Sequence, residues 1–263
     1  MSADRPLSYG RYLKLDVLLG LQQPLSEGPE HDELLFITIH QVYELWFKQL
    51  LHELRGLRSR LDRDDAPAAA ATLKRVLTIL KTLVKQVDVL ETMTPLSFNA
   101  FRARLESSSG FQSGQFRALE FLLGYKRPEL LDALPQDSTA ADLFALLIEP
   151  SIWDRFLAHL DRLGFTMPAA ALQRSPAVPT QADVAVQHQL IAVYRQHPLA
   201  AQLCELLVDL DEGLQEWRYR HLKMVERTIG AKLGTGGSAG MAYLRETLFR
   251  PLFPDLWAIR TRL

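Results

Sequence analysis

Apolar residues recur three and four positions apart along most of the chain, which is the spacing of amphipathic helices. The segment from about 30 to 62 predicts one long helix whose buried face carries Leu35, Ile39, Val42 and Trp46. A second long helix is predicted from about 67 to 92. Its apolar face consists of Leu73, Val76, Leu77, Leu80, Leu83, Val84 and Val87. Runs of alternating β-branched residues between turn signals are absent, so no strands are predicted.

Shorter helices are predicted between turn and loop signals, at 97–105, 112–123, 139–148, from 151 onward, and at 181–196. The last long helix is predicted from about 199 to 229 and ends at Gly230. Its apolar stripe comprises Leu206, Leu210, Leu214 and Trp217. The Ala- and Pro-rich stretch 168–179 is expected on the surface, but the helices on both sides look alike. We therefore predict an all-α bundle of long helices that forms a single domain over residues 1–263.

Composition narrows the class of protein. The 263 residues are 48% hydrophobic and 23% charged, with a net charge of −1, which argues against nucleic acid as the main partner. No apolar run approaches the roughly 20 residues that span a bilayer, and the N-terminus lacks the apolar core of a signal peptide. Cys204 is the only cysteine, which excludes an internal disulfide and a thiolate metal cluster. A cytoplasmic protein without a membrane partner is expected.

Two histidines lie on helix faces that the pattern predicts to be buried. His40 follows Ile39 on the first long helix, and His221 continues the stripe of the last one. An imidazole at position 40 is compatible with a ligand, a proton handler, an acceptor for an apolar substrate or a structural core residue. Glu-x-x-His pairs for a di-iron site are absent, and no spacing suggests a zinc site. A haem with one axial histidine is compatible with the pattern.

The other five histidines are expected to have no part in a site. His31 lies in an acidic helix start, and His188 and His197 lie in polar surroundings. His52 and His159 are predicted to be ordinary surface positions of helices.

Two further features have a structural and a functional interpretation. The Gly-rich segment 234–240 is either a flexible turn or a loop whose backbone and Thr235 hydroxyl close over an anionic or zwitterionic ligand. It lacks the ending of a Walker loop, and no strand precedes it. Arg102 follows Phe98 and Phe101 and is either a surface residue or a clamp for a carboxylate in an aromatic pocket.

Several segments, taken together and in order, resemble the tryptophan 2,3-dioxygenase family. The matching motifs are FITIHQVYELWFK at 36–48, LETMTP at 90–95, SGFQS at 109–113, WRYRH at 217–221 and GTGGS at 234–238. The resemblance extends from Tyr9 to the C-terminus and is weakest between about 130 and 200. It implies a helical fold around ferrous haem b. It also implies cleavage of the indole C2–C3 bond of L-tryptophan by O₂, which gives N-formylkynurenine.

The resemblance assigns roles at the haem and around the indole. It makes His221 the axial ligand of the iron. It makes His40 the distal histidine, which accepts a hydrogen bond from the indole N–H, and it places Phe36 on the distal wall. Ser109 and Gly110 correspond to residues near the haem edge and its propionates.

The resemblance also assigns the substrate head group and the assembly. Arg102 pairs with the substrate carboxylate, and Thr235 holds the amino-acid head group. Residues 1–29 are expected to pack on a neighbouring subunit of a homotetramer. There, Tyr9, Tyr12 and Leu13 complete the neighbour's pocket.

Two departures from the family pattern bear on the substrate. Phe98 stands where some members have a tyrosine whose hydroxyl helps bind the carboxylate, and Ala239 stands where a second serine is expected. A haem monooxygenase of the same superfamily, acting on tryptophan or a substituted tryptophan, is therefore an alternative. A non-catalytic haem-binding or sensing protein is another.

Overall fold

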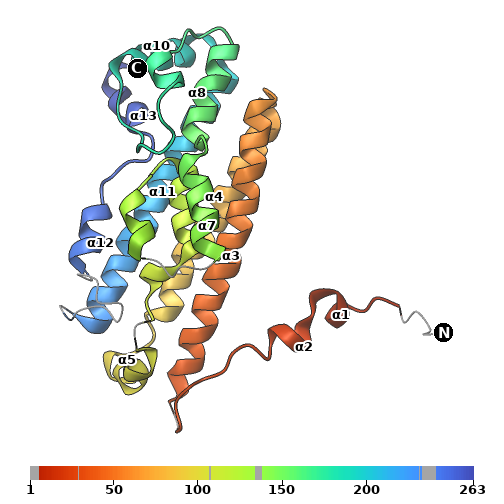
Figure 1. The fold of residues 1–263 in the computed structure, drawn as a ribbon, viewed down its shortest axis with the longest axis vertical. Helices are drawn as coiled ribbons and strands as arrows, with labels where there is room; N and C mark the ends of the chain where they lie inside the picture. Colours follow the sequence, from red (N-terminus) through yellow and green to blue (C-terminus); the bar gives the residue numbers. More distant parts are fainter. Residues whose placement is uncertain (1–5, 29, 107, 134–137, 231, 233–240) are drawn as a thin grey trace.

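Three long helices form the frame of the molecule (Figure 1). The computed structural model describes residues 6–28, 30–106, 108–133, 138–230, 232 and 241–263. The long helices are α3 (His31–Asp62), α4 (Ala66–Leu90) and α11 (Pro198–Ile229), and α4 packs extensively against both others. No strand occurs in these described ranges, so the prediction of an all-α bundle is confirmed.

Shorter elements cover this frame. They are α5 (Pro95–Arg102), η1 (Ala103–Leu105), η2 (Gly110–Gln112), α6 (Gly114–Leu123), η3 (Pro128–Ala133), α7 (Ser138–Ile148), α8 (Ile152–Arg162), α9 (Ala169–Leu172), α10 (Val184–Gln196), α12 (Met241–Thr247), α13 (Pro254–Ala258) and η4 (Arg260–Arg262). Helices α6 and α8 pack on α3, α7 packs on α6, and α10 packs on α11. Within the part of the chain that the structure describes, no helix combines the length and apolarity needed to cross a membrane.

The predicted helices differ from the observed ones mainly at their ends. Pro95 begins α5 instead of interrupting the chain, because a proline in the first helical turn removes no internal hydrogen bond. The Thr94 side chain caps that turn by accepting a hydrogen bond from the Ser97 N–H. Elements of three to seven residues, such as η2, α9 and α12, were not predicted since they are too short to show a periodic pattern.

The apolar faces of α4 and α11 were predicted correctly. On α3 the prediction of Ile39 was also correct, but the rest of the predicted face was displaced by one position after it. The buried stripe of α3 runs through Ile39, Tyr43 and Phe47 and on to Leu50 and Leu54. The predicted residues Leu35, Val42 and Trp46 are only half-buried. The physical reason is that two large rings bury more apolar area than Val42. The Tyr43 hydroxyl also finds an acceptor in the interior, the Leu83 carbonyl at 2.8 Å.

His159 is the second correction, because it is fully buried and not a surface position. Its Nδ1 lies 2.7 Å from a carboxylate oxygen of Asp64, and Arg162 donates to the same carboxylate. Asp64 adopts a left-handed backbone conformation (φ 58°) in the turn between α3 and α4, which brings its side chain to α8. The pair therefore links α8 to the turn between α3 and α4. The partner lies 95 residues away in the chain, so no local pattern indicates it.

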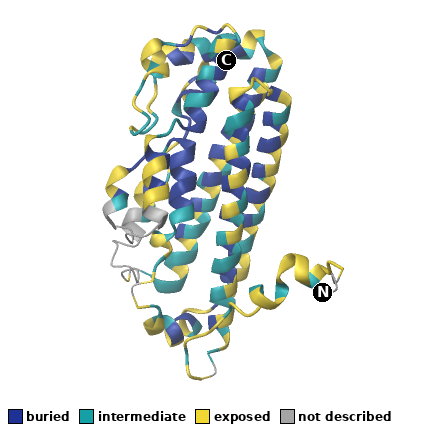
Figure 2. Ribbon diagram, turned by 45° about the vertical axis from the view of Figure 1, so that its right-hand side comes forward, coloured by how far each residue is buried: buried dark blue, intermediate teal, exposed yellow. Residues whose placement is uncertain are grey.

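The N-terminal arm, residues 6–28, projects from the bundle (Figures 1 and 2). It contains two short helices, α1 (Tyr9–Leu13) and α2 (Leu15–Leu18), and neither has a buried residue. Its large apolar side chains are nevertheless numerous, and seven of them are more than half exposed: Leu7, Tyr9, Tyr12, Val17, Leu19, Leu21 and Leu25. An apolar segment held away from its own core is typical of a surface that contacts another molecule.

The hydrogen bonds to Asp64 make stability depend on pH. Arg162, and then His159, hold the pKa of this carboxyl at about 2, below the ordinary value of 3.8. The ionised carboxylate therefore stabilises the fold above about pH 4, and that contribution disappears as the pH falls toward 2. We expect Asp64→Asn to lower the midpoint of urea unfolding clearly at pH 7 and less at pH 3. The control is Glu212→Gln, at an exposed acid of α11. A deficit in Asp64→Asn that is independent of pH would contradict this account.

Candidate functional site

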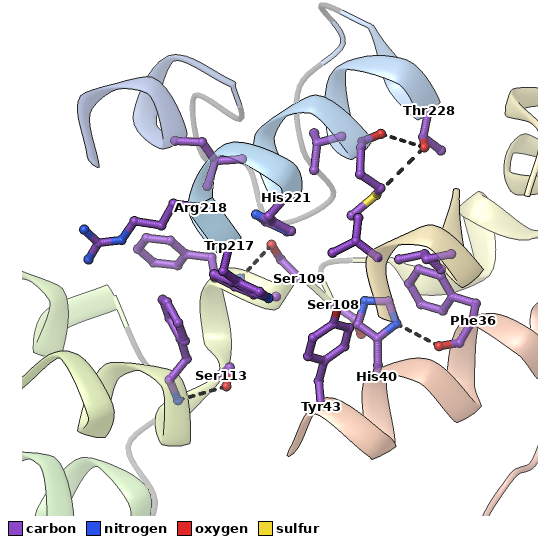
Figure 3. Close-up of a pocket in the computed structure, with 18 of the residues that line it drawn as sticks. Phe36, His40, Tyr43, Ser108, Ser109, Ser113, Trp217, Arg218, His221 and Thr228 are labelled. Atoms are coloured by element: carbon purple, nitrogen blue, oxygen red, sulfur yellow. Dashed lines mark hydrogen bonds between the residues drawn. The ribbon is translucent and has the colours of Figure 1, made fainter. Parts of the chain in front are cut away.

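A cavity of about 270 Å³ opens between α3, α5, α6 and α11. Its wall is mostly aromatic and aliphatic, with a few polar groups at its edges. Such a lining favours a largely apolar ligand that a small number of polar contacts orient. Figure 3 shows His221 and His40 at this cavity, one from α11 and one from α3. Both candidate histidines thus lie at one site, although 181 positions separate them in the chain.

His221 is half-buried and lines the cavity. Its ring stacks on Trp217, one helical turn earlier in α11, with the ring centroids 5.2 Å apart and an angle of 2° between the planes. Burial lowers the pKa of His221 to about 4, so its imidazole is neutral at pH 7 and keeps a lone pair. Among the described residues, no hydrogen bond fixes this ring. A neutral imidazole of this kind can ligate a metal.

His40 differs because one of its nitrogens is already engaged. Its Nδ1 lies 2.7 Å from the Phe36 carbonyl oxygen, which can only accept, so Nδ1 carries the proton. Burial lowers the pKa of His40, although the hydrogen bond to Phe36 opposes this shift, and the ring is neutral at pH 7. The other nitrogen, Nε2, is then an acceptor. His40 can receive an N–H from a ligand while its orientation stays fixed.

Three phenylalanines form an aromatic cluster beside His40. Phe36 lies with its ring centroid 5.8 Å from that of Phe98 and 5.5 Å from that of Phe101. The Phe98 and Phe101 rings meet edge to face at 5.4 Å. Arg102 is the last residue of α5, directly after this cluster, and it lines the cavity. The cation therefore stands at the end of an aromatic wall, where a carboxylate attached to a flat apolar group could reach it.

The segment 108–113 closes one edge of the cavity, and hydrogen bonds fix its shape. The Ser109 hydroxyl accepts the Phe111 N–H at 3.3 Å. Glu44, on α3, accepts the Ser113 hydroxyl at 2.6 Å and the Gln115 amide at 2.8 Å. Glu44 lies one helical turn after His40. Helix α3 therefore holds this histidine and, through Glu44, also the edge of the cavity that residues 108–113 form. Sequence analysis missed Glu44, because its partners lie about 70 residues away.

A buried ionic cluster supports the cavity wall next to His221. The carboxylate of Glu120, which is 1% exposed, accepts hydrogen bonds from Arg117 and Arg127 at 2.5 Å and from Arg218 at 3.0 Å. Burial alone would raise the pKa of Glu120, but the three guanidinium groups outweigh it and hold this pKa below the ordinary value. Arg218 precedes His221 by three positions on α11, so the cluster ties this helix to α6. Sequence analysis missed it as well, since Glu120 lies 98 residues from Arg218.

The structure brings together most of the residues expected at the site. His40, His221, Phe36 and Arg102 line the cavity, as do Phe98, Ser109 and Gly110. Tyr9, Tyr12 and Leu13 do not line it; they lie on the projecting arm with 77%, 70% and 40% of their surfaces exposed. Thr235 and Ala239 lie outside the described residues.

The residues present fit a haem group. The neutral ring of His221 has no hydrogen-bond partner among the described residues and lines the cavity, as a single axial ligand requires. The described residues include no group of three or more His, Cys, Asp or Glu side chains placed to hold a metal ion. Phe111, Phe116 and Met224 supply apolar surface for a flat macrocycle.

Comparisons with known proteins agree with the motifs. A family model described as "Tryptophan 2,3-dioxygenase" matches residues 2–140 and 180–263. A tryptophan 2,3-dioxygenase of Herpetosiphon aurantiacus is 59% identical over 260 residues, which cover 98% of each chain. One of Anaeromyxobacter dehalogenans is 59% identical over 255 residues, covering 97% of this chain and 95% of the relative. One of Bordetella pertussis is 46% identical over 263 residues, covering 98% and 92%.

Removing the central charge of the buried cluster should be costly. Glu120→Gln leaves three arginines around a neutral amide, and breaking a buried ion pair in this way costs about 3–5 kcal/mol of folding free energy. Glu205→Gln is the control, since it breaks a partly exposed pair with Arg260 that is worth about 1 kcal/mol at most. Urea unfolding of the two variants measures the difference. Equal losses would contradict a special role for Glu120.

Proposed function

The chain belongs to the tryptophan 2,3-dioxygenase family, and from this premise we propose that its cavity is the active site of the family reaction. The cavity binds haem b through His221 and holds L-tryptophan on the His40 side. The reaction cleaves the indole C2–C3 bond with O₂ and releases N-formylkynurenine. One observation carries the proposal: two neutral histidines line the same aromatic cavity, and only one of them has its ring nitrogen engaged by a carbonyl.

His221 is proposed as the only protein ligand of the iron. Its lowered pKa keeps the imidazole unprotonated, and the stacked Trp217 ring restrains its rotation. When bound, the haem supplies the activation of O₂, which no side chain of the protein can perform. The protein contributes the orientation of the reactants and the exclusion of water. Ser109 and Gly110 line the edge of the cavity and are proposed to contact the haem near its propionates.

His40 is proposed to orient the indole and not to act as an obligatory base. The carbonyl of Phe36 fixes the proton on Nδ1, so Nε2 can accept the indole N–H. A hydrogen bond at this single polar atom of the indole sets the direction of its C2–C3 edge. The Phe36 and Phe98 rings restrict the plane in which the indole lies.

The zwitterionic tail of the substrate requires partners of opposite charge. Arg102 is proposed to pair with the carboxylate, since it lies at the end of the aromatic wall. Phe98 offers no hydroxyl, so Arg102 and Thr235 share the binding of the head group. Ala239 likewise offers no hydroxyl near that threonine in the sequence.

The projecting arm is proposed to complete the active site of a neighbouring subunit. Tyr9, Tyr12 and Leu13 are exposed and do not line the cavity of their own chain. Burying apolar side chains of this size on a partner stabilises the assembly by about 1.5–3 kcal/mol each. We propose a homotetramer, as in the family. The cytoplasmic location expected from the sequence stays a prediction.

The product decides between this reaction and its alternatives. The purified protein is reduced without oxygen and then given O₂ and L-tryptophan. The expected product is heavier than tryptophan by about 32 mass units, because both oxygen atoms are retained. A gain of about 16 mass units that requires added reductant would indicate a monooxygenase. Haem binding without turnover would indicate a sensing or carrier protein.

The two histidines should respond differently to removal. We expect His221→Ala to lose most of its haem, because this residue is the proposed ligand of the iron. His40→Ala should keep its haem and its Soret absorbance but bind tryptophan less tightly and turn it over more slowly. Haem content per chain and tryptophan titrations of the reduced protein measure these effects. Equal haem loss in the two variants would overturn the assignment.

Mixed oligomers test whether the arm acts on a neighbour. A Tyr9→Ala/Tyr12→Ala chain has an intact cavity but a defective arm, and an Arg102→Ala chain has the reverse. Each alone should have low activity at subsaturating tryptophan. Co-expression of the two should restore part of the activity, because some sites combine an intact cavity with an intact arm from the other chain. Activity equal to the sum of the separate variants would exclude this arrangement.

A further inference from the structure

A buried carboxylate at the start of α3 holds the base of the N-terminal arm. Glu33 lies in the first turn of α3 and is 2% exposed. One of its oxygens accepts the Leu25 N–H at 2.7 Å, and the other accepts the Ser26 N–H at 3.1 Å. Hydrogen bonds between an ionised acceptor and backbone donors are among the stronger ones in proteins. The carboxylate therefore binds the chain seven and eight residues upstream of itself.

Glu33 retains its charge although it is buried. Burial alone would raise its pKa, but the hydrogen bonds from residues 25 and 26 and the nearby charge of Arg104 bring the pKa below its ordinary value. The positive end of the α3 dipole favours an anion in the same turn. The carboxylate is thus a permanent acceptor at neutral pH.

A second attachment lies two helical turns further along α3. Gln22 donates its side-chain amide to the Gln41 oxygen at 2.6 Å, and Gln41 donates its own amide to the Leu21 carbonyl at 3.0 Å. The two points of attachment are about 12 Å apart along the helix axis, at a rise of 1.5 Å per residue. Two separated points fix a direction, whereas one would act as a pivot.

The rest of the arm has little to hold it to its own chain. Neither α1 nor α2 buries a residue, and the apolar side chains of this segment face outward. The course of residues 6–20 is therefore determined at residues 21–26. Because no core residue lies in the arm, loosening its base leaves the packing of the bundle unchanged.

We infer that Glu33 is a positioning residue that acts on the active site of the neighbouring subunit, by fixing the direction in which the arm leaves α3. The inference rests on the proposed function of the arm. Glu33 does not line the cavity of its own chain, so it acts through the arm and not by contact with that site. Because Glu33 already restricts the arm in the free chain, the arm loses less conformational entropy when Tyr9 and Tyr12 dock on the partner.

The test compares three full-length holoenzymes. Glu33→Gln keeps the shape of the side chain, but only one atom can still accept, and the new amide donor faces a backbone N–H. Asp32→Asn is the matched control: it removes the same charge from the same turn, and no hydrogen bond joins Asp32 to the arm among the described residues. Tyr12→Ala removes an arm contact directly. Gln22→Met loosens the second attachment and serves as an independent variant if Glu33→Gln folds poorly.

We expect Glu33→Gln to raise the KM for tryptophan roughly tenfold, the equivalent of one strong hydrogen bond, with kcat and haem content little changed. Trypsin should also cut the arm after Arg11 and Lys14 several times faster than in the unchanged protein, as mass spectrometry of the native digest would show. Tyr12→Ala should raise KM as well, and Gln22→Met should have a smaller effect in the same direction. Asp32→Asn should match the unchanged protein in both assays.

The outcomes separate the inference from the function on which it rests. If Tyr12→Ala raises KM while Glu33→Gln leaves KM and trypsin cleavage unchanged, the arm acts in the neighbour but Glu33 does not position it. If neither variant raises KM, the proposed role of the arm fails and the inference fails with it. If Glu33→Gln loses haem and its urea midpoint falls while arm cleavage is unchanged, its role is structural. Product mass, measured in every variant, tests the reaction itself independently of all three.

Discussion

The packing of α4 against both α3 and α11 is the constraint on which the candidate site depends. Helices α3 and α11 each carry one histidine of the cavity, and α4, packed between them, holds the two helices in place. Tyr43 of α3 and Trp217 of α11 both line the cavity, and their ring centroids are 6.2 Å apart. A site built from long, rigid helices changes shape less than one built from loops. The loop-borne groups are added at the edges of this frame.

Burial disfavours charge on the titratable groups around this cavity, but the outcome differs among them. It lowers the pKa of His40, although Glu44 and the Phe36 carbonyl oppose this shift, and it lowers the pKa of His221, so both imidazoles are neutral at pH 7. Glu120 is buried more deeply, yet it stays ionised because three guanidinium groups surround it. The cavity needs both the neutral imidazoles and the carboxylate whose charge the arginines compensate. The first leaves lone pairs available at the cavity, and the second holds the wall behind them.

Helical periodicity was sufficient to predict the bundle and the faces of α4 and α11. His40 and His221, which were predicted on buried faces, are half-buried and line the cavity. Periodicity was not sufficient for α3, where half-buried and buried residues alternate so closely that two adjacent stripes satisfy the same pattern. The contacts of His159, Glu44 and Glu120 could not be predicted from the chain alone. Each pairs with residues about 70 to 98 positions away, and such pairings depend on the tertiary fold. The aromatic residues beside Arg102 were compatible with both a surface position and a carboxylate clamp, and only the family resemblance assigned it to the site.

The arm has a consequence for how activity depends on the amount of protein. If Tyr9 and Tyr12 complete the pocket of another chain, as proposed, a chain holds an incomplete pocket while it is alone, even with its own fold finished. Complete sites then form by a second-order process, and their number follows mass action and not the quantity of folded chain. Activity per chain should therefore fall on dilution at a concentration set by subunit affinity. In a cell that synthesises few copies, the activity of each copy is therefore lower.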